Sequence, residues 1–266
     1  MMKITALLEN ISECELKAKH GLSLYIETKN RRILFDLGSD RTFFFYFKTR
    51  GIDLTTIDTV IISHGHMDHG GALKHFLEIN STAKIYIQRK AFEAHYSKAL
   101  FLKVNVGIDN KLINHPQVVL LDGDSQIHEE LWLFTVESTD KYYSAANDTL
   151  YTENGRDNFS HEQNLIIKDD KTVLITGCGH TGIVNILEKA KSYHPEVCIG
   201  GYHLYNPITK KTVSEELLKE IMEELQKYNQ MQYYTYHCTG QEAFMFFSKH
   251  MSNMHYLSCG KSIEID

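Results

Sequence analysis

The first half of the chain alternates short apolar runs with polar turns, a pattern that is typical of strands. The expected strands cover residues 3–8, 22–27, 31–37, 60–62, 84–88, 118–121 and 131–136. The run over residues 60–62 is continuously apolar, which is typical of a strand that is buried on both faces. Apolar positions predict helices over residues 72–78 and near 91–100, and the aromatic run 42–47 is interpreted as the core face of another helix. The polar segment 137–156 predicts a long loop.

The second half repeats one unit, in which a strand ends in a loop that carries glycine or histidine and a helix follows. The expected strands cover residues 165–168, 171–176, 197–200 and 233–236, and the expected helices cover residues 183–192, 213–228 and 241–250. Thr212 with Glu215, and Thr239 with Glu242, have the spacing of a capping box at the starts of the last two helices. No linker rich in proline, glycine or serine divides the chain, so we expect a single domain over residues 1–266 with two similar halves.

Histidine follows the ends of four of these strands. The loop after residues 60–62 reads Ser-His-Gly-His-Met-Asp-His-Gly-Gly, which places four metal-ligand side chains within six residues. The histidines and the aspartate in the four loops are His64, His66, Asp68, His69, His180, His203 and His237. Because sites in α/β sheets form beyond the carboxyl ends of the strands, we expect these side chains to converge. Imidazole and carboxylate groups are ligands of zinc, manganese and iron, so the pattern predicts a metal cluster.

Length, composition and charge exclude several other classes of protein. The 266 residues are 42% hydrophobic and 23% charged, as in ordinary globular proteins, and the net charge of −6 gives no general attraction to nucleic acid or anionic membranes. Five cysteines without a Cys-x-x-Cys pair argue against a disulfide framework. No apolar run approaches the roughly 20 residues of a transmembrane helix, and the apolar start is too short for a signal peptide. We therefore expect a cytoplasmic protein with a small-molecule substrate and with no nucleic-acid or membrane partner.

The motif Ser-His-Gly-His-Met-Asp-His-Gly-Gly resembles the signature of the metallo-β-lactamase superfamily. The segments Leu-Phe-Asp-Leu-Gly, Thr-Gly-Cys-Gly-His-Thr-Gly-Ile-Val-Asn, Gly-Gly-Tyr-His-Leu and His-Cys-Thr-Gly are similar to those of one branch. That branch contains the archaeal dihydropterin–ribofuranosylaminobenzene phosphate synthase and bacterial relatives. The resemblance covers nearly the whole chain, and it implies an α/β fold, the four-layer αββα metallo-β-lactamase sandwich.

The resemblance also implies a centre for one or two divalent metal ions. The residues that match by position are His64, His66 and His180 for the first ion and Asp68, His69 and His237 for the second. Zinc is the preferred identity, with manganese and iron as the alternatives. A bound ion lowers the pKa of a water molecule from 15.7 toward about 7 and so yields hydroxide at neutral pH. We expect Asp68, as a ligand near that hydroxide, to act in catalysis by orienting it and receiving a proton.

Five further residues are candidates for a role near this centre. Members of the superfamily carry a Gly-Asp pair whose aspartate bridges the two ions, whereas the counterpart here is glycine followed by Cys178. We interpret Cys178 as a small buried residue, with a thiolate ligand as the alternative. His203 is a candidate for either a metal ligand or a substrate contact. Glu162, and His161 beside it, are weaker candidates for a ligand or for a residue that supports one. Asp36 is expected either to orient a ligand histidine or to cap a turn.

These observations favour a metal-dependent hydrolase that acts on a small, phosphate-bearing anion. The anion is expected because the helices that follow His180 and His237 begin with free N–H groups. A synthase that releases pyrophosphate and a non-enzymatic protein that binds metal or ligand are the alternatives. A nuclease of the RNase Z kind shares the metal motif, but the acidic charge and the lack of a basic stripe argue against it.

Overall fold

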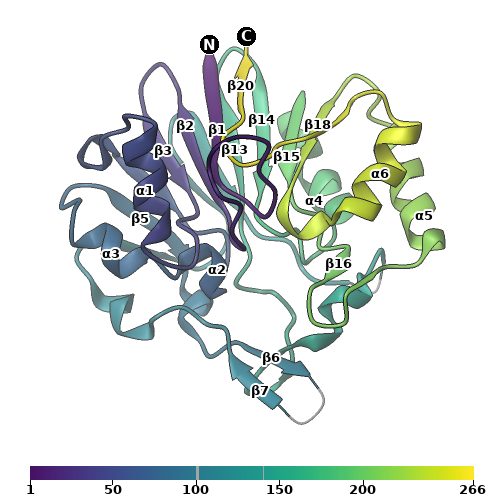
Figure 1. Cartoon of the computed structure of the whole chain (residues 1–266), viewed down its shortest axis with the longest axis horizontal. Helices are drawn as coiled ribbons and strands as arrows, with labels where there is room; N and C mark the ends of the chain where they lie inside the picture. The colour runs from purple at the N-terminus through teal and green to yellow at the C-terminus, as the bar shows by residue number, and fades with distance from the viewer. Residues whose placement is uncertain (100–101, 140) are drawn as a thin grey trace.

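The computed structural model describes residues 1–99, 102–139 and 141–266, and it shows two packed sheets with helices on both outer faces (Figure 1). The first sheet consists, in spatial order, of β20 (Ser262–Ile265), β1 (Met2–Leu8), β2 (Ser23–Glu27), β3 (Arg32–Phe35), β4 (Thr59–Ile61), β5 (Lys84–Gln88) and β8 (Val118–Leu121). The second consists of β19 (Met254–Tyr256), β18 (Gln232–Thr235), β15 (Val197–Gly200), β14 (Thr172–Thr176), β13 (Asn164–Lys168), β10 (Leu131–Phe134) and β9 (Ser125–His128). The predicted αββα sandwich is confirmed.

Three apolar clusters fill the spaces between the four layers. Val60 and Ile62 pack in the cluster beneath the helices of the first sheet, whereas Ile61 packs between the two sheets. Successive side chains of a strand point to opposite faces, so the predicted burial of this run on both faces is confirmed. The helices on the first sheet are α1 (Thr42–Thr49), α2 (Met67–Gly70) and α3 (Leu73–Leu77), and those on the second are α4 (Ile183–Ala190), α5 (Glu215–Gln226) and α6 (Gln241–His250).

Each sheet contains parallel strands, and these determine where the histidine-bearing loops open. Strands β3, β4, β5 and β8 run parallel in the first sheet, as do β14, β15, β18 and β19 in the second. Because the carboxyl ends of parallel strands lie at one edge, the loops after β4, β14, β15 and β18 meet there. The assignment of one domain with two similar halves stays a prediction, although each half supplies most of one sheet.

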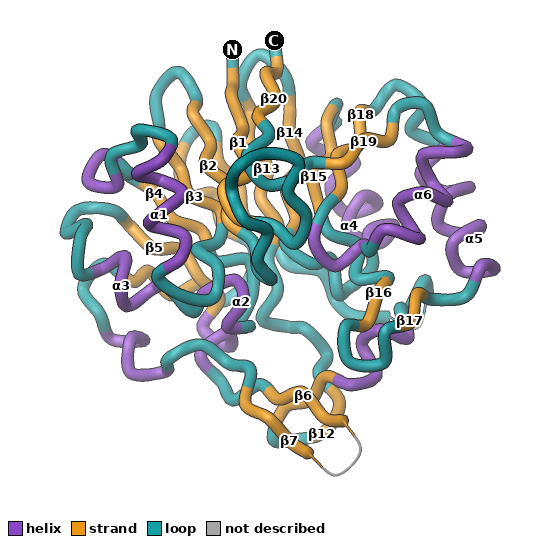
Figure 2. Tube along the Cα trace, in the orientation of Figure 1, coloured by secondary structure: helices purple, strands orange, loops and turns teal. Residues whose placement is uncertain are grey.

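A small sheet and a hairpin lie at the end of the sandwich opposite the two termini (Figure 2). The small sheet has the order β12 (Gly155–Arg156), β11 (Leu150–Thr152), β6 (Tyr96–Ala99), β7 (Leu102–Asn105), and the hairpin pairs β16 (Tyr205–Asn206) with β17 (Lys211–Thr212). Both stand beside the edge where the histidine-bearing loops open. Within the described ranges, no helix has the length and apolar character needed to span a membrane.

Two predictions for the middle of the chain are wrong. The segment expected to be helical near residues 91–100 is a 3-10 helix over Arg89–Phe92 followed by strand β6, and Leu100 lies outside the described residues. Part of the expected loop over 137–156 forms a 3-10 helix (Ala145–Thr149) and then β11 and β12, while Asp140 is not described. β6 pairs with β11, more than fifty residues away, and this pairing overrides the local apolar pattern.

Both predicted capping boxes are also wrong. Ser214 is the N-cap of α5, and its hydroxyl accepts a backbone N–H from the first turn. The hydroxyl of Thr212 instead donates to Glu242 at 2.6 Å, so it is not available to the helix. The hydroxyl of Thr239 accepts the backbone N–H of Tyr202 at 2.9 Å, and α6 begins without a side-chain cap. In both cases the threonine hydroxyl bonds a residue that is distant in the sequence, and this bond replaces the predicted bond within the first turn of the helix.

Candidate metal centre

Three buried imidazoles converge where the loops after β4 and β14 meet. The ring centroids of His64, His66 and His180 lie 4.6, 4.9 and 5.1 Å apart in pairs. The Nε2 atom of each ring is buried and has no hydrogen-bond partner among the residues that the structure describes. An unpartnered buried polar atom is costly and rare in folded proteins, so three at one point fit a cation that all of them would contact. These are the residues that the sequence assigned to the first ion.

A second group lies beside the first, on α2 and the loop after β18. The Oδ2 atom of Asp68 lies 3.3 Å from Nε2 of His237 and 3.6 Å from Nε2 of His69. The Nε2 atoms of His69 and His237 are themselves 3.3 Å apart. His20 adds a contact that the sequence did not indicate, because its Nε2 lies 3.2 Å from the same Asp68 oxygen. Asp68, His69 and His237 are therefore brought together, and their ligand atoms are close enough to hold a second cation.

The ring nitrogen that faces away from the cluster is bonded to an oxygen in four of these histidines. A donor at Nδ1 leaves Nε2 with a free lone pair, which is the tautomer that a metal ligand needs. The contacts of Nδ1 are His64 with Ser63 Oγ (2.8 Å), His69 with Asp36 Oδ2 (2.6 Å), His180 with Asn147 Oδ1 (2.9 Å) and His237 with Asn10 Oδ1 (3.0 Å). The rings are thus oriented before any ion binds.

The electrostatic environment differs between the two groups. Burial, together with the neighbouring imidazoles, lowers the pKa of His64 and His180 well below the usual range, so these rings are neutral. Burial also opposes a charge on His69, but the carboxylates of Asp68 and Asp36 outweigh it and raise the pKa of His69 to about 9. At neutral pH the metal-free second group therefore carries a proton that an incoming cation would displace.

Cys178 lies between the two groups. Its Sγ atom is 3.2 Å from Nε2 of His69, and it lies within 4.8 Å of ligand atoms of His64 and His180 on one side and of His237 on the other. The side chain is buried, and burial raises the pKa of its thiol above the usual range in the metal-free protein. The thiol therefore occupies the position between two candidate ions, where other members of the superfamily were expected to place an aspartate.

His203 completes the inner part of the site. Its ring lies 4.1 Å from that of His180 between centroids, and both of its ring nitrogens are buried without a hydrogen-bond partner in the described part of the chain. Its backbone N–H donates to Sγ of Cys238, a residue that the sequence analysis did not single out. The geometry is compatible with either predicted role, as a ligand or as a substrate contact.

The carboxylates of Asp36 and Glu162 accept hydrogen bonds from the loops that carry the candidate ligands. Both oxygens of Asp36 accept hydrogen bonds from Ser63, one from its backbone N–H and one from its hydroxyl, and Oδ2 also meets His69. Glu162 accepts the backbone N–H of His180 at 2.8 Å and the N–H and hydroxyl of Thr181 at 3.0 and 2.9 Å. These bonds engage both Glu162 oxygens with the loop, so Glu162 positions His180 and does not face the ions.

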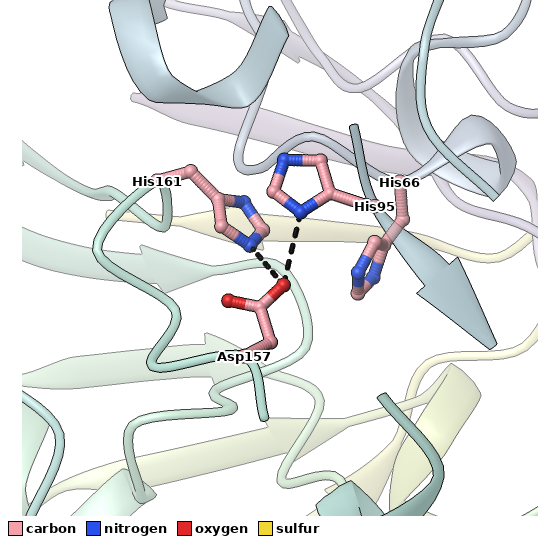
Figure 3. A group of neighbouring side chains, drawn as sticks. All are labelled: His66, His95, Asp157 and His161. Carbon is pink, nitrogen blue, oxygen red and sulfur yellow. Dashed lines mark hydrogen bonds and ion pairs between the residues drawn. The ribbon is translucent and has the colours of Figure 1, made fainter. Parts of the chain in front are cut away.

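His95, Asp157 and His161 form a further buried group beside His66, and of these only His161 was a candidate from the sequence (Figure 3). Oδ2 of Asp157 lies 2.9 Å from Nδ1 of His95 and 3.2 Å from Nε2 of His161. The other nitrogen of His161 accepts the backbone N–H of Gly65 at 2.9 Å, which fixes the peptide between the two histidines of the His-x-His motif. Asp157 and His161 are four residues apart in one loop, but no spacing in the sequence links them to His95.

The residues that line a pocket above the centre include His66, Asp68, His180, His203 and His237. The pocket is also bordered by the small sheet and by the turn of the β16–β17 hairpin. A small molecule in this pocket would therefore contact both candidate ion sites. The arrangement combines oriented nitrogen, oxygen and sulfur ligands with an adjoining cavity, which is the usual form of a catalytic metal site.

Comparison with known proteins gives consistent results. Residues 17–142 match the metallo-beta-lactamase superfamily. The 7,8-dihydropterin-6-methyl-4-(beta-D-ribofuranosyl)-aminobenzene-5'-phosphate synthase of Methanocaldococcus jannaschii is 30% identical over 93% of this chain and 90% of its own length. An uncharacterized protein of the same archaeon is 27% identical over the full length of both chains. A solved metal-dependent hydrolase of the beta-lactamase superfamily superposes with a TM-score of 0.80 at 24% identity over all of both chains.

The structural similarity agrees with the layers of the fold. The match to the synthase extends beyond the segment with the His-x-His-x-Asp-His motif and includes the strands and loops of the second half. Together they show that the chain belongs to the metallo-β-lactamase superfamily.

Proposed function

We propose that the protein is a metal-dependent hydrolase of a small molecule, with two divalent ions held at the centre described above. The observation that carries the proposal is the convergence of three buried, unpartnered Nε2 atoms from His64, His66 and His180. These would hold the first ion, and Asp68, His69 and His237 the second. Nitrogen and oxygen ligands of this kind suit zinc first, with manganese and iron as the alternatives.

Such ions would supply two things when bound, a water molecule of lowered pKa and stabilisation of negative charge on the substrate. Hydrolysis adds the oxygen of water to the electrophilic atom of the substrate, breaks the bond to the leaving group and delivers one proton to that group. The carboxylate of Asp68 is the group placed to receive and pass on this proton, because Asp68 lines the pocket. His20, 58% exposed, bonds its Oδ2 atom and holds the carboxylate in position.

We further propose that Cys178, as a thiolate, would help to hold both ions, since its sulfur lies near the candidate ligands of each; this gives the first prediction. Cys178→Ser is expected to reduce the zinc content from two ions per chain toward one, because a neutral hydroxyl is a poor substitute for a thiolate ligand. Metal analysis of protein purified with added zinc measures this. Cys198→Ser is the matched control, since Cys198 is buried in the core beneath α4–α6. Unchanged zinc content in Cys178→Ser would mean that the thiol only fills space.

The activity itself is tested with the zinc-loaded protein on four substrate classes: a phosphomonoester, a phosphodiester, a lactone and a thioester. We expect turnover of at least one class, its loss after chelation and its recovery when zinc is returned. Bound zinc without turnover of any class would contradict the proposal and favour the alternative of a non-enzymatic metal-binding protein.

A second candidate function is synthesis with release of pyrophosphate. It is supported by the 30% identity to the archaeal synthase over 93% of this chain. The two functions differ in the product that appears, so an assay for pyrophosphate with a pterin-type diphosphate substrate separates them. Release of pyrophosphate only when the second reactant is present would favour the synthase.

The phosphate-bearing part of the sequence prediction has less support from the geometry. It relied on the helix starts after His180 and His237, but the first turns of α4 and α6 supply none of the described residues that line the pocket. The described lining also contains no lysine or arginine. A phosphate group in this pocket would depend for charge on the ions and the histidines alone.

A further inference from the structure

The candidate metal centre forms the floor of a pocket of about 460 Å³. The floor is polar, because it is made of histidines, Asp68 and two cysteines. The walls are different in character, since they come from the small sheet and from the turn of the β16–β17 hairpin. The apolar residues of these walls are Leu102, Val104, Val106, Leu150, Pro207 and Ile208.

These walls carry an unusual number of exposed, large apolar side chains. Eight large apolar side chains in the described part of the chain are highly exposed, and three of them line this one pocket. Leu102 is 70% exposed, Val104 56% and Ile208 42%. Single exposed apolar residues are common, but several gathered around a cavity mark a binding surface for apolar groups.

The two faces of the β6–β7 hairpin carry different kinds of side chain. Leu102 and Val104 line the pocket, whereas the residue between them, Lys103, has its Nζ atom 3.5 Å from the centroid of the Tyr96 ring. Lys98 likewise lies over the Tyr151 ring, at 3.8 Å. Because alternate residues of a strand face opposite ways, the cations stand on the face away from the pocket and leave an apolar face toward it.

The two asparagine side chains that line the pocket are engaged within the protein. The amide nitrogen of Asn206 donates to the carbonyl of Ala146 at 2.9 Å and to the hydroxyl of Thr149 at 3.0 Å. The amide of Asn10 bonds His237. A ligand therefore finds polar partners at the floor and aliphatic carbon at the walls.

We propose that the substrate carries an alkyl arm of several carbons, which lies between β7 and the β16–β17 turn while the hydrolysed group reaches the ions. This rests on the proposed metal-dependent hydrolysis and narrows its substrate class. Leu102 and Val104 on one side, with Pro207 and Ile208 on the other, are the residues that select the arm. Aliphatic side chains dominate these walls, which favours a flexible alkyl chain over a charged or strongly polar substituent.

The test measures binding of straight-chain alkyl hydroxamates, from two to eight carbons, to the zinc-loaded protein by calorimetry. The hydroxamate group chelates zinc and stands in for the reacting group, while the chain stands in for the arm. We expect each added methylene that the walls bury to tighten binding by up to about fourfold, until the chain outgrows the pocket. The double variant Leu102→Ser with Val104→Ser should lose most of this gain and keep its affinity for the shortest member. Met245→Ser, which changes an exposed apolar residue on α6, is the matched control.

The outcomes separate the two proposals. Equal affinity for all chain lengths, with binding that still requires zinc, would overturn the alkyl arm and leave the metal centre intact. Failure of every hydroxamate to bind the zinc-treated protein would overturn both. If chain length has no effect but the double variant converts a dimer to a monomer in sedimentation, the apolar walls are an interface between two copies of the chain.

Discussion

His66→Ala is expected to leave the protein with less bound zinc and to reduce turnover by more than about 100-fold. Loss of a residue that merely orients a metal ligand costs about 10- to 100-fold in metal affinity or activity, so loss of a ligand should exceed that. The Nε2 atom of His66 is one of the three unpartnered atoms that converge on the first ion site. Its removal leaves His64, His180 and the proposed Cys178 thiolate as the protein ligands there, and a site that has lost one of its ligands holds zinc more weakly.

Metal analysis and initial rates on the same preparation measure this effect. His250→Ala is the control, because His250 is exposed at the end of α6 on the far side of the second sheet. Thermal unfolding of both variants distinguishes metal loss from a damaged fold, since His66 is buried and its removal leaves a small cavity. Full zinc occupancy in His66→Ala would remove this residue from the set of ligands.

The parts of the fold with strong local signals could be predicted from the sequence. Strands β5, β8 and β15 have the predicted bounds, as does helix α6. Each strand is a short run of apolar residues that needs no distant partner to be recognised. The metal motif was equally local, because His64 to His69 occupy one loop and the start of one short helix. Where a ligand set lies within six residues, its spacing is enough to indicate the chemistry.

Apart from Asp36 and Glu162, which were candidates, the residues that orient the ligands could not be predicted, because they come from distant parts of the chain. Asn10 reaches His237 across 227 positions, and Asp157 reaches His95 across 62. β20 pairs with β1, at the opposite end of the sequence, and was not predicted at all. Such contacts leave no regular spacing in the sequence, because they form only when the two sheets pack together.

The backbone conformation at the site could not be predicted from the sequence, for a related reason. Asp36, His203 and His237 adopt positive φ angles of 62°, 45° and 50°, which side chains other than glycine rarely do. Local preference would place glycine or asparagine there. The tertiary structure imposes these conformations at the strand ends, where the side chain must turn into the cluster. The sequence therefore indicated which side chains converge, and it did not indicate how the backbone presents them.

Asp36→Ala is expected to lower the free energy of unfolding by about 3–5 kcal/mol, the usual cost of removing one partner from a buried, charged hydrogen-bond network. The carboxylate is fully buried and accepts three hydrogen bonds, two from Ser63 and one from His69. Alanine would leave all three donors without a partner in the interior. Urea unfolding of chelator-treated protein measures the loss without a contribution from bound metal. Asp170→Ala is the control, since Asp170 is half exposed and a surface ion pair contributes at most about 1 kcal/mol.

Asp36→Asn tests whether this carboxylate also sets the tautomer of His69. Asparagine keeps the shape and one acceptor oxygen, so the loss of stability should be smaller than with alanine. Its amide, however, would turn an N–H toward Nδ1 of His69, and the ring would respond by moving its own proton to Nε2. Nε2 is the atom that faces Asp68 and His237, so a proton there blocks the second ion while the first remains. The expected result is a stable protein that binds one zinc ion per chain; two ions in Asp36→Asn would show that His69 keeps its tautomer without the carboxylate.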